Sequence, residues 1–330
     1  MTSSRKTEVL QLLRNSGDYV SGQQICETLG ISRTAVWKIM NQLKEEGYEI
    51  EAGQNKGYRL NGTPDVLSLA ELQSRVKTRM AGKELLYFDV IDSTNLEAKR
   101  RAEEGAPEGL LIVADKQVAG RGRRGRSWES PAGANIFMTL LLRPSYPADC
   151  VSMVTLVMAL SVAQAIEEVS KLPVRIKWPN DIVVNKKKVV GILTELTMEA
   201  DYVQYMVSGV GINVNQTSFP EEISATASSL YLEKGQKVNR ALLVQKSMEH
   251  FDENYEIFCR TDDMTGLIGL YNTLLVNKEV TVRVLDPRGE YEGIAHGINE
   301  KGELIVEKED GSVENVYAGE VSVRGIYGYV

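Results

Sequence analysis

The first 60 residues show apolar residues at helical spacing, followed by strand-like alternation. Three apolar faces follow one another, namely Val9–Leu13, Ile25 with Leu29, and Val36–Leu43. This spacing predicts three short helices, because residues three and four positions apart share one helical face. Ser32 is placed to cap the third helix. The segment YEIEAGQNKGYRL then alternates on both sides of a turn and predicts a β-hairpin. Three helices and a hairpin predict a winged helix-turn-helix.

The polar face of the third predicted helix carries residues suited to DNA contact. Helix-turn-helix proteins bind phosphates and base edges through such a face. The candidate DNA-binding residues are Ser32, Arg33, Thr34, Trp37, Lys38, Asn41 and Lys56, with Arg59 also in the hairpin. A protein-binding or purely structural helical domain is the alternative interpretation of this segment.

Short apolar runs dominate the chain from residue 64 to about residue 275. Strands are predicted at 84–91, 109–117, 135–143, 174–184, 188–198 and 203–214, and helices at 94–104, 149–170 and 240–259. Several strands follow one another without a helix between them, so we expect a mixed or antiparallel sheet. The uncharged run 151–166 is shorter than the about 20 residues that span a bilayer. A buried core helix is therefore expected there, and no membrane contact.

From residue 276 onward, apolar and polar residues alternate strongly. Val280, Val282 and Val284 are separated by polar residues, and further short runs follow between turns. This pattern predicts a small β-barrel of the SH3-like kind. The expected architecture is α+β and multidomain, with a winged helix at 1–63, a mixed-sheet α/β domain at 64–275 and the barrel at 276–330.

Charge and cysteine content narrow the classes of function. The 330 residues carry 38 basic and 45 acidic side chains, a net charge of −7, which argues against coating nucleic acid through bulk charge. Residues 1–62 carry a net charge of +1, whereas the segment from 277 onward carries −5. The three cysteines are isolated and the two histidines share no motif, so a disulfide framework, a zinc site or a Ser-His-Asp triad is not expected. With no apolar leader segment evident, we expect a cytoplasmic protein.

The most unusual stretch is GRGRRGR at 120–126. It satisfies the GxGxxG spacing of dinucleotide-binding proteins, but it runs into SWESPAG, which contains Pro131 and Gly133 and is a poor start for a helix. A glycine-rich loop dense in arginine is instead suited to wrapping an anion with N–H groups and guanidinium forks. An RGG-like nucleic-acid tract is the alternative, which a single copy between strands in an acidic protein disfavours.

Four further segments flank this loop. DSTN at 92–95 ends a strand and begins a helix, for which simple capping is the default interpretation. KWPND at 177–181 interrupts an apolar stretch, and Lys188 is the member of a lysine run that adjoins the next apolar strand. GVGIN at 209–213 places small residues where a ligand can approach the backbone closely.

Together these motifs resemble those of biotin–protein ligases. STN, Q-x2-GRGRRGR, KWPND-x6-K-x2-GIL and GVGIN occur in the family's order, and the resemblance extends over essentially the whole chain. The N-terminal winged helix is similar to that of the bifunctional bacterial type, which is also the biotin operon repressor. The segment 215–230 is less distinctive.

The resemblance implies roles for individual residues. The implied biotin-binding residues are Ser93, Thr94, Asn95, Gln117, Gly120, Arg121, Gly122, Arg123, Lys188, Gly191 and Ile192. The implied ATP- and adenylate-binding residues are Arg123, Arg126, Trp128, Lys177, Asn180 and Asn213. Arg121, Arg123 and Lys188 are the implied catalytic residues, and Asp181 is a candidate for binding metal or positioning the acceptor lysine.

The family's activity has two steps, formation of biotinyl-5′-adenylate from biotin and ATP, and transfer of biotin to a lysine of the biotin carboxyl carrier protein. The resemblance therefore implies biotin, ATP and Mg²⁺ as ligands, operator DNA as a partner, and a homodimer when the adenylate is bound. Lipoate–protein ligase is one alternative, which the arginine loop and the winged helix disfavour. A ligand-sensing repressor without catalysis is another, which Lys188 and the complete arginine loop disfavour.

Overall fold

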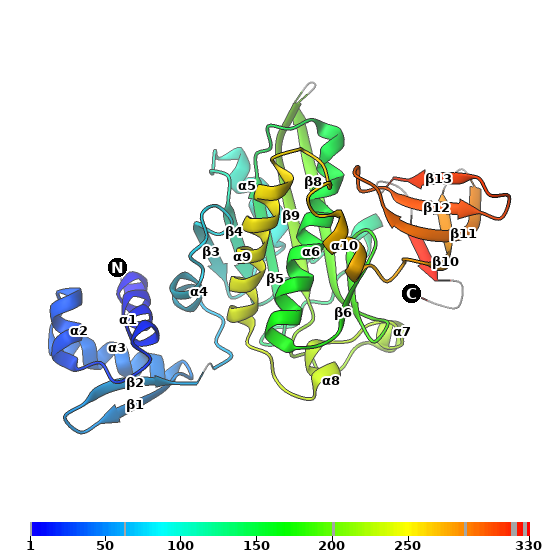
Figure 1. Cartoon of the computed structure of the whole chain (residues 1–330). Coiled ribbons are helices and arrows are strands. Elements are labelled where there is room, and N and C mark those ends of the chain that lie inside the picture. Colours follow the sequence, from blue (N-terminus) through cyan, green and yellow to red (C-terminus); the bar gives the residue numbers. More distant parts are fainter. Residues whose placement is uncertain (1, 63, 200–201, 287–288, 318–321, 326–328) are drawn as a thin grey trace. The chain divides into compact units, whose positions relative to one another are not determined.

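The computed structural model describes residues 2–62, 64–199, 202–286, 289–317, 322–325 and 329–330. The chain forms two compact units (Figure 1). The first unit comprises Met1–Lys77 together with Asn239–Gln245, and the second comprises Thr78–Val238 together with Lys246–Val330. The proposed domain limits at 63 and 275 remain predictions; the first unit continues to Lys77.

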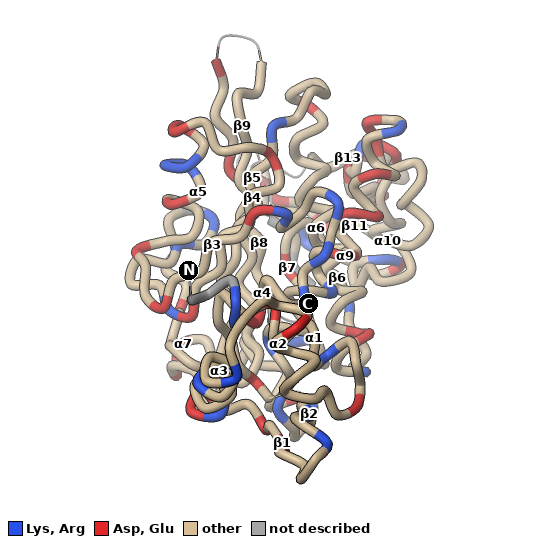
Figure 2. The backbone as a smooth tube through the Cα atoms, turned by 90° about the vertical axis from the view of Figure 1, so that its left-hand side faces the viewer, with Lys and Arg blue, Asp and Glu red and all other residues tan. Residues whose placement is uncertain are grey.

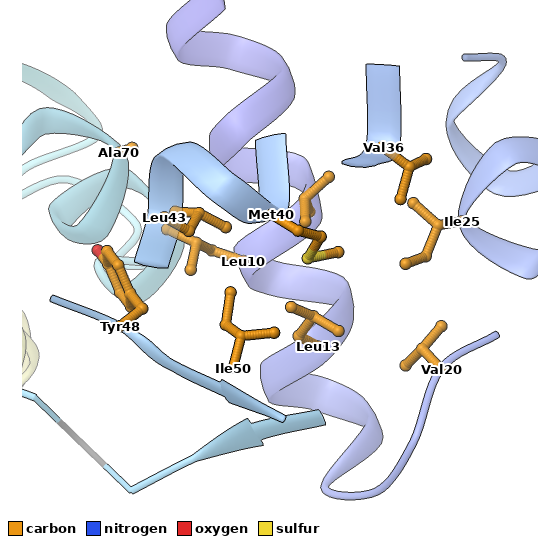
Figure 3. Close-up of a cluster of buried hydrophobic side chains, with 11 residues drawn as sticks. Leu10, Leu13, Val20, Ile25, Val36, Met40, Leu43, Tyr48, Ile50 and Ala70 are labelled. Atoms are coloured by element: carbon orange, nitrogen blue, oxygen red, sulfur yellow. The ribbon is translucent and has the colours of Figure 1, made fainter. Parts of the chain in front are cut away.

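The first unit contains the predicted winged helix-turn-helix. Its elements are α1 (Thr2–Ser16), α2 (Gly22–Leu29), α3 (Arg33–Glu45), β1 (Glu49–Gly53) and β2 (Gly57–Asn61). Ser21 and Ser32 cap α2 and α3, each accepting a hydrogen bond from a backbone N–H three residues on. The apolar faces meet in one core, which Leu10, Met40 and Ile50 help to form (Figure 3). Burial of these faces is what stabilises helices of this length.

A helix that the sequence pattern did not predict, α4 (Leu69–Arg75), also belongs to the first unit. Glu71 of this helix is fully buried. Its carboxylate accepts hydrogen bonds from Arg14 (3.0 and 2.9 Å), Arg75 (2.5 Å) and Tyr48 (2.8 Å). A buried carboxylate is tolerated because several donors compensate for its lost hydration.

The second unit is built on a seven-stranded sheet with the order β3-β4-β5-β9-β8-β7-β6. The strands are β3 (Glu84–Phe88), β4 (Leu110–Ala114), β5 (Ile136–Leu142), β6 (Val174–Lys177), β7 (Asp181–Val184), β8 (Lys187–Glu199) and β9 (Tyr202–Ile212). Only the pair β3 and β4 is parallel among these described neighbours. The predicted mixed sheet is therefore confirmed.

One predicted strand was wrong. The segment 174–184 forms a hairpin rather than a single strand, because β6 and β7 pair antiparallel from Val174 opposite Val184 to Lys177 opposite Asp181. The chain reverses at Trp178–Asn180, where the Trp178–Pro179 peptide bond is cis. The hairpin carries Lys177 and Asp181 to the same end of the sheet.

Helices pack against the sheet. α5 (Thr94–Glu103) contacts β4, β5 and β9, whereas α6 (Val151–Ser170) contacts β6, β7 and β8. Shorter helices are α7 (Glu221–Ser224), α8 (Leu230–Lys234) and α10 (Ile268–Leu274), and α9 (Arg240–Phe258) has residues in both units. Within the described chain, Ala148–Ser170 alone is long and apolar enough to span a membrane, and 72% of its most apolar window is buried. It is the core helix that the sequence predicted.

A second sheet follows α10. Its strands are β10 (Val280–Asp286), β11 (Gly289–Ile298), β12 (Leu304–Lys308), β13 (Val313–Val316) and β14 (Ser322–Gly325), all antiparallel in the order β13-β12-β11-β10-β14. The predicted small β-domain is confirmed. Closure into a barrel requires β13 to pair with β14, and no pairing joins these strands between described residues.

Candidate functional site

Two adjoining cavities lie in the second unit. The smaller has a volume of about 100 Å³ and the larger about 450 Å³. Both cavities are lined by Gly122, Arg123, Trp128, Asn180 and Lys188. A ligand with two parts, one in each cavity, would therefore have its junction beside two cationic side chains.

The start of α5 forms one wall of the smaller cavity. Gln117 Oε1 accepts hydrogen bonds from the Thr94 backbone N–H (2.8 Å) and from Thr94 Oγ1 (3.1 Å). Thr139, from the centre of β5, donates to Thr94 Oγ1 or Asn95 Oδ1 at 2.8 and 2.7 Å. Ser93 occupies the capping position but makes no side-chain cap hydrogen bond. Simple capping therefore does not account for this serine.

Asn95 connects α5 to the long strands β8 and β9. Its amide donates to Leu193 O (3.2 Å) and to Glu195 Oε2 (2.7 Å), while Lys99 binds the other oxygen of Glu195 (2.7 Å). Burial raises the pKa of Glu195, but hydrogen bonds from Lys99 and Asn95 and the charges of Lys99 and Arg121 together bring the pKa below its usual value. Glu195 is therefore a stable anion that holds Asn95 in place.

Three glycines of the sheet make room for side chains of the chain itself. A Cβ atom at Gly209 would lie 2.0 Å from Asn95 Oδ1. At Gly191 and Gly211 it would lie 2.7 and 2.6 Å from the Trp128 indole. Asn95 and Trp128 occupy part of the space at the GVGIN segment, whose Gly209, Val210 and Gly211 also line the smaller cavity. Close approach of a ligand to this backbone stays a prediction.

The Trp128 indole occupies the junction of the cavities. Its ring lies over Gly191 and Gly211, and Lys188 Nζ is 5.2 Å from the ring centroid. The buried Nε1–H has no hydrogen-bond partner among the described residues. An unpaired buried donor is costly, so this N–H is available to a ligand acceptor.

The arginine loop is folded back on itself. The Gly122 N–H donates to Arg126 O (2.7 Å), and the Trp128 N–H donates to Gly120 O (3.0 Å). Between them lies a short 3₁₀ turn, Arg123–Gly125. Arg123 Nη1 donates to Asn180 Oδ1 at 2.9 Å, which carries its guanidinium to the junction of the cavities. Arg121 and Arg126 are exposed.

Lys188 and Asp181 form an ion pair at the same junction. Lys188 Nζ lies 2.6 Å from Asp181 Oδ1, which also accepts a hydrogen bond from Asn180 Nδ2 (3.2 Å). Tyr329 Oη donates to the other oxygen of Asp181. No group of three potential metal ligands occurs among the described residues. The carboxylate of Asp181 is thus already shared between a lysine, an amide and a phenol, and the described side chains do not build a resident metal site.

The segment between β9 and α8 contributes a wall of the larger cavity. Asn213 lines this cavity, and its amide donates to Ser228 O (3.1 Å). Phe219, Pro220 and Ile223 lie along the same wall. Leu285 of the second sheet also lines the cavity. The wall therefore combines apolar side chains with a few polar groups, as ligand cavities commonly do.

Comparisons with known proteins agree with these features. The model of the biotin/lipoate A/B protein ligase family matches residues 87–213, a helix-turn-helix domain model matches 5–59, and the model of the biotin protein ligase C-terminal domain matches 276–324. The bifunctional ligase/repressor BirA of Bacillus subtilis (strain 168) is 40% identical over 98% of this chain and 100% of its own length. This chain belongs to the biotin protein ligase family.

More distant relatives extend the comparison. The bifunctional ligase/repressor BirA of Escherichia coli (strain K12) is 31% identical over 96% of each chain. The structure of the Aquifex aeolicus biotin protein ligase in complex with biotin and ATP covers 74% of this ligase and 99% of its own chain, with 33% identity and a TM-score of 0.66. The resemblance inferred from the sequence motifs is therefore confirmed.

The predicted ligand-binding residues of this ligase gather around the two cavities. The smaller cavity is lined by Ser93, Thr94, Asn95, Gln117, Arg121, Gly122, Arg123, Lys188, Gly191 and Ile192. The larger is lined by Arg123, Arg126, Trp128, Lys177, Asn180, Asn213 and Asp181. Gly120 lines neither, and a Cβ there would lie within 3.0 Å of Ser130, Trp128 and Gln117 atoms. The biotin and nucleotide roles themselves remain predictions.

The predicted DNA-binding residues lie on α3 and the β1–β2 hairpin of the first unit. Trp37 is 59% exposed, and Arg33 donates to Gln23 on α2 (2.9 Å). Arg59 is paired with Glu51 (2.7 Å) and stacks on Tyr19. Charges of both signs occur along these elements (Figure 2). The remaining candidates are Ser32, which caps α3, together with Thr34, Lys38, Asn41 and Lys56, of which all but Asn41 are exposed.

Sequence reasoning missed several residues of the site. Thr139 had a usable signal, because it is the one polar residue in the otherwise apolar, fully buried strand β5. Glu195 and Lys99 carried no motif, and neither did Tyr329, which lies far along the chain from Asp181. Tertiary structure alone brings these residues to the cavities.

Proposed function

We propose that this chain is an ATP-dependent biotin–protein ligase that also represses transcription by binding DNA when its adenylate is bound. The single observation that carries the ligase proposal is the pair of joined cavities with Lys188 and Arg123 at their junction. We assign biotin to the smaller cavity and the nucleotide to the larger. The reacting carboxylate and α-phosphate then meet beside the two cations.

The first step joins two anions. A biotin carboxylate oxygen attacks the α-phosphorus of ATP, the bond to the bridging oxygen of the β-phosphate breaks, and pyrophosphate leaves. Lys188, Arg123 and Arg121 stabilise the negative charge that gathers on the phosphoryl oxygens. Asn180 holds Arg123 in place, at 2.9 Å. Mg²⁺ would enter with ATP and neutralise part of its phosphate charge, since the described side chains build no resident metal site.

The second step transfers biotin. The neutral amine of an acceptor lysine on the biotin carboxyl carrier protein attacks the biotinyl carbonyl carbon. The bond to the AMP oxygen breaks, AMP leaves as an anion, and the nitrogen gives up its extra proton to water as the amide forms. Asp181, which lines the larger cavity, is the carboxylate to which we assign the positioning of that lysine. The Trp128 indole lies over Gly191 and Gly211 and shields the adenylate from water.

Substitution of the two cations tests the ligase proposal. We expect Lys188→Ala and Arg123→Ala to lower pyrophosphate release by about 10²–10³-fold, as loss of one electrostatic contact typically does. Lys187→Ala is the matched control, because this neighbouring lysine lines neither cavity. Wild-type pyrophosphate release from Lys188→Ala would overturn the assignment. Attachment of lipoate instead of biotin to a carrier domain, or no attachment, would overturn the ligase proposal itself.

The repressor activity rests on the winged helix-turn-helix of the first unit. Its net charge of about +1 is small for a DNA-binding domain, so one copy is expected to bind weakly. Adenylate binding orders the loops of the second unit, two chains associate, and the paired recognition helices reach two half-sites of an operator. Gel-shift titration with and without biotin and ATP tests this coupling, and DNA binding that ignores both ligands would contradict it. The protein works in the cytoplasm, where carrier, ATP and DNA occur together.

A further inference from the structure

Tyr329, which follows the last strand of the second sheet, lines the larger cavity. Its hydroxyl donates a hydrogen bond to Asp181 Oδ2. Its ring lies beneath Lys177, whose Nζ is 3.5 Å from the ring centroid. One side chain thus contacts both charged residues that flank the turn between β6 and β7.

The two oxygens of Asp181 have separate partners. Lys188 Nζ lies 2.6 Å from Oδ1, and Asn180 Nδ2 donates to the same oxygen at 3.2 Å. Tyr329 holds Oδ2. A carboxylate held at both oxygens cannot rotate about its Cβ–Cγ bond, so the phenol fixes the direction from which Oδ1 meets the ammonium group of Lys188.

Tyr329 also contacts Lys177. Its side chain is almost fully buried, with 6% exposure. A buried ammonium group needs compensation for its lost hydration, and the face of the Tyr329 ring provides part of it through a cation–π interaction. The ring therefore holds a second cation at the wall of the cavity that we assign to the nucleotide.

We propose that Tyr329 is a positioning residue of the adenylation site, acting on Lys188 through Asp181 and on Lys177 through its ring. The proposal rests on the proposed roles of Lys188 and Lys177. Without the phenol, Asp181 turns both oxygens toward Lys188 and draws the ammonium group away from the anionic reactants. Without the ring, Lys177 loses the cation–π interaction that holds its ammonium group at the wall of the larger cavity.

Two substitutions separate these contributions in the full chain. Tyr329→Phe removes the hydroxyl and keeps the ring, and we expect kcat for pyrophosphate release to fall about tenfold with KM for ATP unchanged, the scale of one hydrogen bond to a charged group. Tyr329→Ala also removes the ring, and we expect KM for ATP to rise about threefold or more. Tyr317→Phe is the control, since Tyr317 is exposed and lines neither cavity.

A double substitution tests the route through Asp181. In an Asp181→Asn background, Tyr329→Phe should have little further effect on kcat, because the anionic acceptor is already gone. Full additivity of the two substitutions, or wild-type kcat in Tyr329→Phe, would overturn the proposal. Should Asp181→Asn be inactive, the same cycle is measured as affinity for a non-reactive biotinyl-adenylate mimic. Lys188→Ala with Tyr329 intact tests Lys188 itself. Normal pyrophosphate release from that variant would overturn the underlying site assignment instead of the role of Tyr329.

Discussion

Single residues of this protein act largely by the space they leave. Gly209, Gly191 and Gly211 lie on adjoining strands, and each lacks a side chain where Asn95 or Trp128 needs room. In a closely packed interior, even one added methyl group must displace its neighbours. The position of Asn95 therefore depends on the absence of a methyl group at residue 209.

Gly209→Ala tests this dependence. The added Cβ would lie 2.0 Å from Asn95 Oδ1, so we expect Asn95 to leave Glu195 and the free energy of unfolding to fall by about 1–3 kcal/mol. Biotin affinity, measured by calorimetry, should fall at least about tenfold, the scale of one lost hydrogen bond to a ligand. Gly269→Ala is the control, because no atom beyond the neighbouring backbone of its own helix lies within 4 Å of the added Cβ. Unchanged biotin affinity in Gly209→Ala would show that Asn95 does not bind biotin.

At this scale the motifs predicted residues that line the two cavities, and the ligand roles of these residues stay predictions. Arg123, Lys188 and Asn180 come from different segments, and the structure brings all three to one junction. The motif could not show that Trp128 fills the space above the glycines, because that depends on how the loop folds back. The role of Tyr329 could not be predicted either, because no local spacing in the sequence relates it to Asp181.

Among the elements, α4 shows how a charged residue can fasten a helix. Glu71 is fully buried and is held by Arg14 of α1, Tyr48 and Arg75. Its helix was not predicted because LAELQSR is only seven residues long, and short helices depend on packing rather than on intrinsic propensity. The hairpin at β6 and β7 was missed although KWPND interrupts the apolar stretch, because each strand has only four residues and so little pattern on either side of the turn.

Glu71→Ala should destabilise the first unit. Removing one partner leaves Arg75 buried without its counter-charge, and we expect a loss of about 3–5 kcal/mol. Tyr48→Phe, which removes a single hydrogen bond, should cost about 1.5 kcal/mol. Glu45→Ala at an exposed position of α3 is the control. Amide hydrogen exchange of residues 5–60 in the full chain measures the change, and protection equal to wild type in Glu71→Ala would refute the role given to this carboxylate.

His296 of β11 makes the second sheet sensitive to pH. Its Nε2 lies 2.9 Å from Glu307 and its Nδ1 lies 3.3 Å from Glu279. The hydrogen bond to Glu307 chiefly, with the contact to Glu279, raises the pKa of His296 above its usual value of 6.5. The folded state thus binds this proton more tightly than the unfolded state does. The resulting stability is fully present below about pH 6.5 and is lost as pH rises through the folded pKa.

We therefore expect the unfolding free energy to fall slightly between about pH 6 and pH 8, with the effect small because the side chain is partly exposed. NMR titration of the imidazole gives the pKa directly, and denaturant melts at the two pH values give the stability. His296→Gln should remove this part of the pH dependence. A pKa of His296 at or below its usual value would contradict the expectation.

For the whole molecule, the distribution of charge predicts weak DNA binding by one copy. The chain carries a net charge of −7, and its basic residues on α3 are interspersed with acidic ones along the first unit (Figure 2). Bulk charge argued against a nucleic-acid coat, and it is compatible with a regulated, site-specific repressor. The fold class and most of the strands followed from the apolar pattern, whereas α4 and the extent of the first unit did not, because residues 239–245 join this unit from far along the chain.

The salt dependence of DNA binding measures how many phosphates each copy contacts. With the operator fragment that the liganded chain selects from a random pool, Lys38→Ala should reduce the slope of log K against log salt by about 0.9 for each copy bound, or about 1.8 for a dimer. The loss should be similar on all DNA sequences, because a phosphate contact carries no sequence information. Lys187→Ala in the second unit is the control. An unchanged slope in Lys38→Ala would remove Lys38 from the DNA contacts.

The helix α9 also has a consequence for how such a protein can evolve. Its first residues belong to the first unit, where Arg240 is buried and pairs with Asp65 at 3.1 Å, and its later residues belong to the second. A recombination event near residue 77 that exchanged the whole of residues 1–77 would replace Asp65 and bring in a foreign partner for Arg240. The two units are thus inherited as a matched pair, and a new DNA specificity is reached more readily by point substitutions on α3 than by exchange of the whole domain.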